Sequence, residues 1–249
     1  MTALIETRRL CKSFGALTVA KDIDFRLCAG ARHALIGPNG AGKTTFVDLL
    51  TGRLAPSSGQ VSLAGRDISR LQQSARVRLG LARTFQINSL FASLSVLDNV
   101  ALAVAERDSI AGRMWRAAST HRTVREEVLE LLSGLGLADD AAAPVAALPY
   151  GKQRLVEIAV ALGLRPKVLL LDEPAAGVPS FESQRILSAL ERLPQNMAIL
   201  LIEHDMDLVF RFASRITVLV QGEVLCEGSP AEVIADRRVR LAYLGESHA

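Results

Sequence analysis

The sequence contains few cysteines, and their number and spacing exclude a disulfide framework. Cys11, Cys28 and Cys226 are odd in number and are not spaced as metal ligands. We therefore expect buried thiols in a reducing compartment. The four histidines are scattered along the chain, so a zinc site is not expected either.

Long apolar runs are also missing. No stretch approaches the roughly 18–20 apolar residues of a membrane span, and the first nine residues lack the hydrophobic region of a signal peptide. We therefore expect a cytosolic protein, or one that sits on a membrane without crossing it. The formal net charge of +3 is too small to argue for a nucleic-acid partner.

The length and the apolar content point to a globular α/β protein. A chain of 249 residues that is 49% apolar suits one large domain, or a domain with a subdomain. Short apolar stretches with strand character alternate with helical stretches, which predicts parallel βαβ units. The expected strands are 3–9, 23–28, 33–36, 60–64, 168–171, 198–202 and 216–220. From about residue 89 to 164 the pattern is helical, clearest over 124–132, with Gly134 and Gly136 ending that helix.

The most informative segment is a glycine-rich loop between an expected strand at 33–36 and an expected helix at 43–50. It matches the pattern G-x-x-x-x-G-K-[ST], whose glycines let backbone N–H groups surround nucleotide phosphates. Lys43 supplies a charge for the β and γ phosphates, Thr44 supplies a hydroxyl for Mg²⁺, and the helix N-terminus faces the anion. The expected phosphate-binding residues are Gly37, Pro38, Asn39, Gly40, Ala41, Gly42, Lys43, Thr44 and Thr45.

Two carboxylates follow the apolar strand at 168–171. Because the strand is buried in the sheet, it places Asp172 at the sheet edge where ligands bind in open α/β folds. Asp172 can hold Mg²⁺ through water, and Glu173 can orient or deprotonate the attacking water.

Two further polar residues follow other short strands. Gln86 is placed to reach Mg²⁺ and the attacking water. His204 ends the strand at 198–202 and can donate to the γ-phosphate. Each of these two residues alone would be weak support for a site.

Taken together, the chain resembles the ATP-binding cassette (ABC) ATPases of membrane transporters. The family's segments occur in the family's order: the phosphate loop at 37–45, Gln86, a signature segment at 148–153, Asp172 with Glu173, and His204. The resemblance implies a P-loop NTPase (RecA-like) core at about 1–88 and 165–249, with an antiparallel β subdomain and an inserted α-helical subdomain at about 89–164.

The resemblance also implies ligands and partners. ATP and Mg²⁺ would bind with Phe14 stacked on adenine and Val19 beside it. A second ABC ATPase subunit, identical or different, would close over each ATP. The residues expected to face the opposite subunit's ATP are Leu148, Pro149, Tyr150, Gly151 and Lys152.

A transmembrane permease is the expected coupling partner, together with an indirect periplasmic or extracellular solute-binding protein and no nucleic acid. The expected location is the cytoplasmic face of the inner membrane. The segment Ile87–Phe91 would form a groove for a permease helix, with Leu90 or Phe91 partly exposed. A basic segment at 106–127 with Trp115 is either a lipid or permease contact or a solvated helical hairpin.

Within the family, the chain looks most like the ATP-binding subunits of branched-chain amino acid importers. The long spacer between Gln86 and Leu148, the Ala175-Ala176-Gly177 sequence and the C-terminal Ala242-Tyr243-Leu244-Gly245 sequence carry this likeness. A soluble ABC ATPase of DNA repair or translation, an exporter subunit and a GTPase are the alternatives. The GTPase alternative lacks support because the guanine-reading Asn-Lys-x-Asp motif is not present in the sequence.

Two prolines depart from the family's pattern. Pro149 replaces the signature serine whose hydroxyl contacts the γ-phosphate of the opposite subunit, a loss of about 1 kcal/mol. Pro179 stands where the family often has Asp and the branched-chain group often Asn. These prolines reflect either subgroup variation or a weakened signature half in a mixed dimer.

Overall fold

The computed structural model describes residues 2–84, 90–109 and 122–244. Contacts divide the chain into two compact units. The first comprises Met1–Leu81, Lys167–Leu171 and Pro194–Ala249, and the second comprises Ala82–Pro166 and Asp172–Leu193. The second unit thus contains more of the chain than the helical insertion expected at 89–164.

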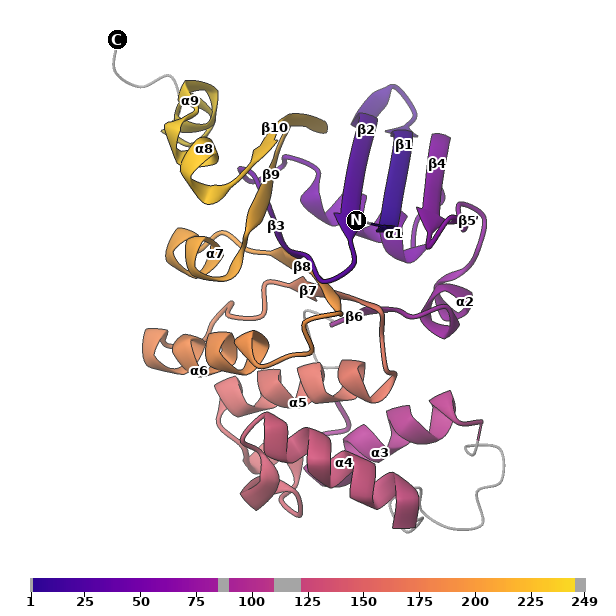
Figure 1. Cartoon of the computed structure of the whole chain (residues 1–249), viewed down its shortest axis with the longest axis vertical. Helices are drawn as coiled ribbons and strands as arrows, with labels where there is room; N and C mark the ends of the chain where they lie inside the picture. Colours follow the sequence, from indigo (N-terminus) through magenta and orange to yellow (C-terminus); the bar gives the residue numbers. More distant parts are fainter. Residues whose placement is uncertain (1, 85–89, 110–121, 245–249) are drawn as a thin grey trace. The chain divides into compact units, whose positions relative to one another are not determined.

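A six-stranded sheet has the strand order β10-β9-β3-β8-β7-β6 (Figure 1). Most of it belongs to the first unit, whereas Ala82, Arg83 and Asp172 are assigned to the second. β3 pairs in parallel with both β8 and β9, as the alternating pattern predicts, whereas β10 is antiparallel to β9. All residues of β7 and β8 are buried, because helices and loops cover both faces of a parallel sheet. The strand bounds are Arg32–Ile36 for β3, Leu81–Arg83 for β6, Val168–Asp172 for β7, Ala198–Ile202 for β8, Arg215–Val220 for β9 and Glu223–Gly228 for β10.

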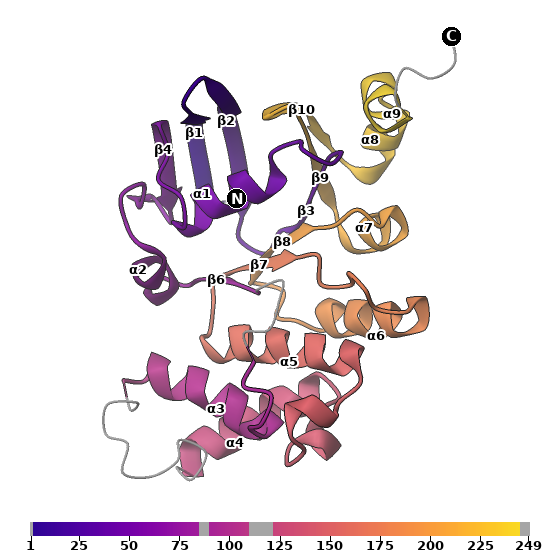
Figure 2. The same ribbon diagram turned by 180° about the vertical axis from the view of Figure 1, so that it is seen from behind.

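A second, antiparallel sheet has the order β2-β1-β4-β5, and its first three strands lie side by side in Figures 1 and 2. β1 (Ala3–Phe14) and β2 (Leu17–Cys28) are each longer than the expected strands at 3–9 and 23–28. Repeated bulges interrupt their pairing, which breaks the strict alternation that a sequence pattern needs. β4 is Ser58–Leu63 and β5 is Arg66–Asp67.

A buried arginine anchors the helix that follows the phosphate loop. Arg76, from α2 (Gln73–Arg78), is almost fully buried below α1 (Lys43–Thr51). Its guanidinium donates to the carbonyls of Leu49 and Leu50 at 2.7 and 2.6 Å, at the C-terminal end of α1. These carbonyls lack partners within a helix, so a fixed cation satisfies them and complements the helix dipole. Burial lowers the pKa of Arg76 to about 10.

Three short helices complete the first unit. α8 and α9 contact β10, and α8 also contacts β9. Ser229 begins α8 with a capping box, because its side chain and that of Glu232 satisfy each other's backbone N–H groups. The bounds are Met206–Phe212 for α7, Pro230–Ala235 for α8 and Arg237–Leu244 for α9.

Helices dominate the second unit, as expected. α3, α4 and α5 pack on one another, and α6 packs on α5. Arg107 joins the first three of these helices: from the end of α3 it donates to Glu127 of α4 and to the Gly163 carbonyl that ends α5. The bounds are Val96–Arg107 for α3, Arg122–Gly134 for α4, Tyr150–Gly163 for α5 and Ser180–Glu191 for α6, with short 3-10 turns at Ala138–Asp140 and Val145–Ala147.

Two sequence expectations about the surface change with the structure. The three cysteines are free, but each is partly exposed rather than buried, since β1, β2 and β10 present one face to solvent. Arg107, placed in the expected basic segment, is an ion-paired structural residue; Arg113, Trp115 and Arg116 lie outside the described residues.

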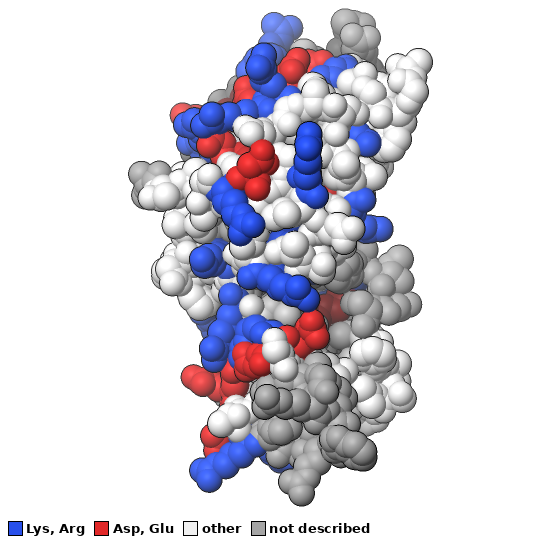
Figure 3. Space-filling view, turned by 90° about the vertical axis from the view of Figure 1, so that its right-hand side faces the viewer, with Lys and Arg blue, Asp and Glu red and all other residues white. Residues whose placement is uncertain are grey.

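On the face drawn in Figure 3, basic and acidic side chains are interspersed, so this face does not carry charge of one sign alone. Among the residues that the structure describes, no helix has the length and apolar character needed to cross a bilayer.

A buried histidine lies in β3, directly before the phosphate loop. His33 is only 1% exposed, packs its ring edge on Phe25 and hydrogen-bonds through Nε2 to the Thr217 hydroxyl at 2.8 Å. Burial lowers the pKa of His33 from 6.5 to about 4, although the Glu227 charge acts in the opposite direction. The folded protein therefore holds His33 neutral at neutral pH.

His33 should make stability depend on pH between about 6.5 and 4. Because the unfolded chain binds the proton more readily, the contribution of neutral His33 is complete above pH 6.5 and is lost as the pH falls. We expect the free energy of unfolding to fall by roughly 2 kcal/mol more in the wild type than in His33→Gln between pH 7 and pH 5. Urea unfolding at a series of pH values measures this difference; parallel curves for the two proteins would contradict it.

Candidate nucleotide-binding site

The loop at 37–45 connects β3 to α1 and has no room for side chains at two of its glycines. A Cβ on Gly37 would lie 2.1 Å from the Leu219 carbonyl oxygen, and one on Gly42 would lie 2.8 Å from the Val19 carbonyl oxygen. Gly42 also has φ of +97°, a conformation that residues with a side chain rarely adopt. The loop is thus a backbone cradle that a Cβ would fill.

The turn between β9 and β10 supports the same loop. The N–H of Gly222 donates to the Ala41 carbonyl at 2.9 Å, and its own carbonyl accepts from the Lys21 N–H at 2.8 Å. A Cβ on Gly222 would lie 2.5 Å from the Val19 carbonyl oxygen. The phosphate loop, β2 and the turn between β9 and β10 are distant in the sequence, and they therefore meet here through backbone atoms.

Lys43 lies across the loop. Its ammonium donates to the carbonyls of Gly37 and Pro38 at 2.6 and 3.1 Å, so the charge is positioned over the cradle. The first turn of α1 has no side-chain cap, since Gly42 occupies the N-cap position. Its N–H groups, together with the helix dipole, suit a phosphate. Thr44 is exposed beside them.

The expected adenine contacts lie on the hairpin between β1 and β2. Phe14 is 50% exposed, and the Lys12 ammonium lies 5.0 Å from the centre of its ring. An exposed aromatic face beside a cation suits a nucleobase. Val19, on the same hairpin, approaches the phosphate loop through its carbonyl oxygen, as described above.

One residue near the loop was not assigned a role from the sequence. Tyr243 in α9 contacts the loop, because the Gly37 backbone hydrogen-bonds to its phenolic oxygen. Burial raises the pKa of Tyr243 to about 12. No local signal in the sequence relates residue 243 to residue 37, since the relation exists only through the packing of α9 on β10.

In the second unit, Asp172 ends β7 as expected and is buried. Its carboxylate forms an ion pair with the guanidinium of buried Arg83, and its N–H donates to the Thr84 hydroxyl at 3.4 Å. The next residue, Glu173, has φ of +48°. Non-glycine residues adopt this left-handed region uncommonly; Arg9, Ala64 and Arg165 are among the other described residues that do so.

Of the expected catalytic residues His204 and Gln86, the structure describes only His204. His204 follows β8 in the first unit with its side chain 66% exposed, and its Nδ1 lies 3.9 Å from the carboxylate of buried Glu203. Glu203 also accepts from the His204 N–H at 3.1 Å, which fixes the backbone there. Gln86 lies outside the described residues.

The signature segment begins α5. Pro149 is the N-cap residue, and Tyr150 is 45% exposed. The Leu148 side chain is buried, which leaves only its backbone to face a ligand. Lys152 pairs with Asp140 at 2.7 Å.

The N–H of Gly151 donates to the Glu182 carboxylate of α6 at 3.1 Å. This contact was not anticipated, because Glu182 is 31 residues away in the sequence.

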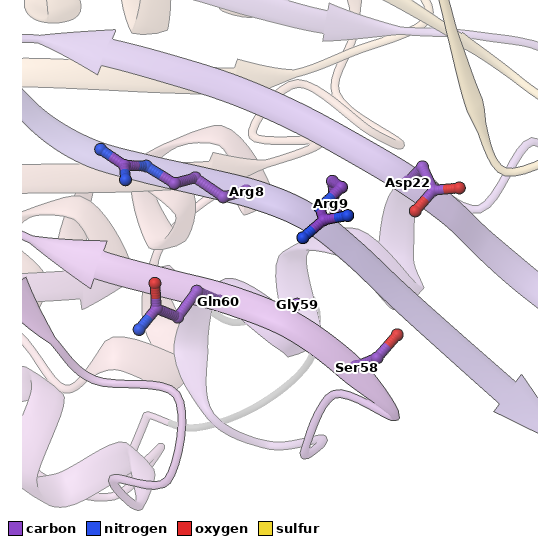
Figure 4. Close-up of a pocket in the computed structure, with 6 residues that line it drawn as sticks. All are labelled: Arg8, Arg9, Asp22, Ser58, Gly59 and Gln60. Atoms are coloured by element: carbon purple, nitrogen blue, oxygen red, sulfur yellow. The ribbon is translucent and has the colours of Figure 1, made fainter.

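A separate hollow of about 610 Å³ lies on the antiparallel sheet (Figure 4). Its lining residues are Arg8, Arg9, Asp22, Ser58, Gly59 and Gln60. It is open and polar, and Arg8 pairs with Glu6 at 3.3 Å. The charge of Arg8 is thus partly compensated, and none of the expected site residues lines this hollow.

Comparison with known proteins agrees with the geometry. A family model described as "ABC transporter" matches residues 20–176. The chain belongs to the ATP-binding cassette family. A second model, "Branched-chain amino acid ATP-binding cassette transporter", matches residues 223–249. The predicted family and its ATPase activity are thereby confirmed.

Individual relatives cover nearly the whole chain. It is 36% identical to the high-affinity branched-chain amino acid transport ATP-binding protein LivG of Salmonella typhimurium, over 98% of each chain. It is 35% identical to the lipopolysaccharide export system ATP-binding protein LptB of Acidithiobacillus ferridurans, over 99% of this chain and 98% of that protein. A crystallised ABC cassette in its ADP conformation superposes with a TM-score of 0.87 at 27% identity, covering 99% of this chain and 100% of that one.

The ABC cassette's nucleotide cradle should not accept a side chain at Gly42. We expect Gly42→Ala to weaken ATP binding about tenfold or more, because the new Cβ both strains the backbone and meets the Val19 carbonyl. Gly65→Ala is the matched control, since Gly65 also has a positive φ but has nothing within 4 Å of its Cβ position. Fluorescent ATP-analogue titration compares the two; equal affinities would show that the loop tolerates a side chain.

Proposed function

We propose that this chain is the ATP-hydrolysing subunit of a bacterial importer for branched-chain amino acids or related small solutes. The observation that carries the proposal is the match of residues 223–249 to the branched-chain model, in addition to the general ABC match. The full-length similarity to LivG supports it. Transport requires a separate permease, and we propose a solute-binding protein outside the membrane that delivers the substrate to that permease.

Binding of ATP uses the residues of the first unit. The cradle at 37–45 and the first turn of α1 take the phosphates through backbone N–H groups. Lys43 moves its ammonium from the loop carbonyls to the β and γ phosphates, where it compensates negative charge. Phe14 stacks on adenine, with Val19 beside it.

Mg²⁺ suits the donors that this chain offers. The cation prefers oxygen ligands and keeps several waters while it binds one or two carboxylates and the substrate's phosphates. Thr44 offers an exposed hydroxyl and Asp172 a carboxylate; we propose that Thr44 binds directly, Asp172 through water, and Gln86 as a further ligand. When bound, the ion neutralises charge on the phosphates.

For hydrolysis, we propose that Glu173 accepts a proton from the attacking water. It directly follows Asp172, the last residue of β7, and its backbone φ is +48°. His204 is exposed enough to donate toward the γ-phosphate, while buried Glu203 fixes its backbone. Lys43 and His204 together stabilise charge on the transferring phosphoryl group.

Two cassettes are required in this scheme. Each ATP is held between the phosphate loop of one subunit and the signature segment, residues 148–153, of the other, in a homodimer or a mixed dimer. Because ATP binds the closed pair more tightly than the open pair, binding closes the subunits and hydrolysis releases them. Pro149 supplies no hydroxyl, so the Gly151 backbone and the α5 N-terminus carry the contact.

We propose that the permease docks near Phe91. Buried Asn99 of α3 accepts from the Phe91 N–H at 2.8 Å and donates to the carbonyls of Phe91 and Ser95 at 3.1 and 2.9 Å. The backbone is thus fixed while Phe91 as a residue is 59% exposed, which suits an apolar partner. Docking there would hold the chain at the cytoplasmic face of the membrane.

Glu173→Gln tests the proposed chemistry. The variant keeps the shape of the side chain but cannot accept the proton, so we expect ATP binding to remain and turnover to fall by about 10²–10³-fold. Glu191→Gln, a similar change at the far end of α6, should leave turnover unchanged. Phosphate release by the reconstituted transporter is the readout, and near-normal hydrolysis by Glu173→Gln would overturn the assignment.

Lipopolysaccharide export is the second candidate, favoured by the similarity to LptB. The two functions differ in what is lost when the gene is deleted from its host. We expect deletion to abolish uptake of radiolabelled leucine, isoleucine or valine, and the wild-type gene but not the Glu173→Gln variant to restore it. Normal uptake together with loss of lipopolysaccharide from the cell surface would favour the export function instead.

A further inference from the structure

The start of the signature helix α5 lacks a side-chain cap of its own. Pro149 occupies the N-cap position and forms no side-chain cap hydrogen bond. Instead, the Gly151 N–H donates to the Glu182 carboxylate at 3.1 Å. Serine, threonine, asparagine or aspartate usually supplies an oxygen to the first turn; here the oxygen comes from another helix and carries a charge.

Glu182 fits closely against the glycine. A Cβ on Gly151 would lie 2.2 Å from Glu182 Oε2, so any other residue at 151 would exclude the carboxylate from this position. Beside this contact, the Tyr150 ring packs on Gly177, where a Cβ would lie 3.4 Å from the ring. Two contacts therefore join the start of α5 to the segment 173–182, which begins with the proposed catalytic Glu173.

A carboxylate and a phosphate oxygen compete for the same group. Both are anions that bind at helix N-termini through N–H donors and the helix dipole. The single hydrogen of the Gly151 N–H cannot serve both at full strength. Two neighbouring negative charges would also repel each other.

We propose that Glu182 occupies, within its own subunit, the position that the γ-phosphate of the opposite subunit's ATP takes on closure. This inference rests on the proposed two-subunit arrangement. Glu182 is an autoinhibitory group: it keeps the α5 N-terminus satisfied in the open state, and it leaves the Gly151 N–H before the signature segment engages ATP. When Glu182 leaves Gly151, the segment 173–182 loses one of its two contacts with α5. Binding of the opposite subunit's ATP by the signature segment is thereby coupled to Glu173 of the same subunit.

The test measures ATP-driven dimerisation in the Glu173→Gln background, where turnover does not consume the ligand. The full-length chain is titrated with MgATP, and light scattering gives the concentration at half-maximal dimer. We expect Glu182→Ala to lower this concentration about tenfold, the effect of one charge-assisted hydrogen bond. Glu182→Gln, which keeps an acceptor without the charge and preserves the side-chain volume, should fall between.

Two controls separate competition from other effects. Glu191→Ala removes the same charge from the other end of α6 and should leave the midpoint unchanged. The affinity of the single subunit for a fluorescent ATP analogue should be the same with and without Glu182, because the phosphate loop is not altered.

The possible failures are distinguishable. An unchanged midpoint in both Glu182 variants would overturn the inference while leaving the two-subunit scheme intact. A higher midpoint would also overturn it, because Glu182 would then position the signature segment rather than obstruct it. Absence of any ATP-driven dimer in the Glu173→Gln parent would overturn the proposed arrangement, and this inference with it.

Discussion

Close approach of backbone to backbone around the phosphate loop is the constraint on which the nucleotide site depends. Gly37 meets the end of β9, and Gly42 and Gly222 both meet the Val19 carbonyl. Any side chain at these positions would separate segments that are far apart in the sequence. The same contacts link the hairpin that carries Phe14 to the loop that carries Lys43, so the groups expected to bind the base and the phosphates are positioned by one set of packing interactions.

In the second unit, charged residues are held by partners within that unit. Arg83 compensates buried Asp172, and Arg107 joins α3, α4 and α5. Burying either charge of the Arg83–Asp172 pair alone would be costly, which accounts for an arginine just before the expected Gln86 position. The inserted helices are thereby a firm support for the two segments at their surface, the signature segment and the exposed Phe91.

Patterns in the sequence predicted most of what is local. The strands at 33–36, 168–171, 198–202 and 216–220, and the helix after the phosphate loop, are present within about one residue, because continuous apolar runs and glycine turns determine them. The lengths of β1 and β2 were wrong, since their bulges hide the alternation. The cysteines were expected inside because apolar thiols usually are, but they lie on half-exposed strands.

Contacts over long sequence distances could not be predicted. Tyr243 at Gly37, Arg76 at the end of α1 and Glu182 at Gly151 each join residues separated by at least one whole element. A single sequence contains no signal for such pairs, because propensity and periodicity describe neighbours along the chain. The roles of Glu173 and His204 remain predictions.

Arg76 has one more consequence, which concerns dissolved ions. Surface ion pairs such as Arg122 with Glu126 weaken as salt is added, because mobile ions screen them. The charge of Arg76 is enclosed by protein, where dissolved ions screen much less effectively, so its hold on the carbonyl end of α1 varies little with ionic strength. The attachment of Arg76 to α1 should therefore be less sensitive to salt concentration than these surface ion pairs are.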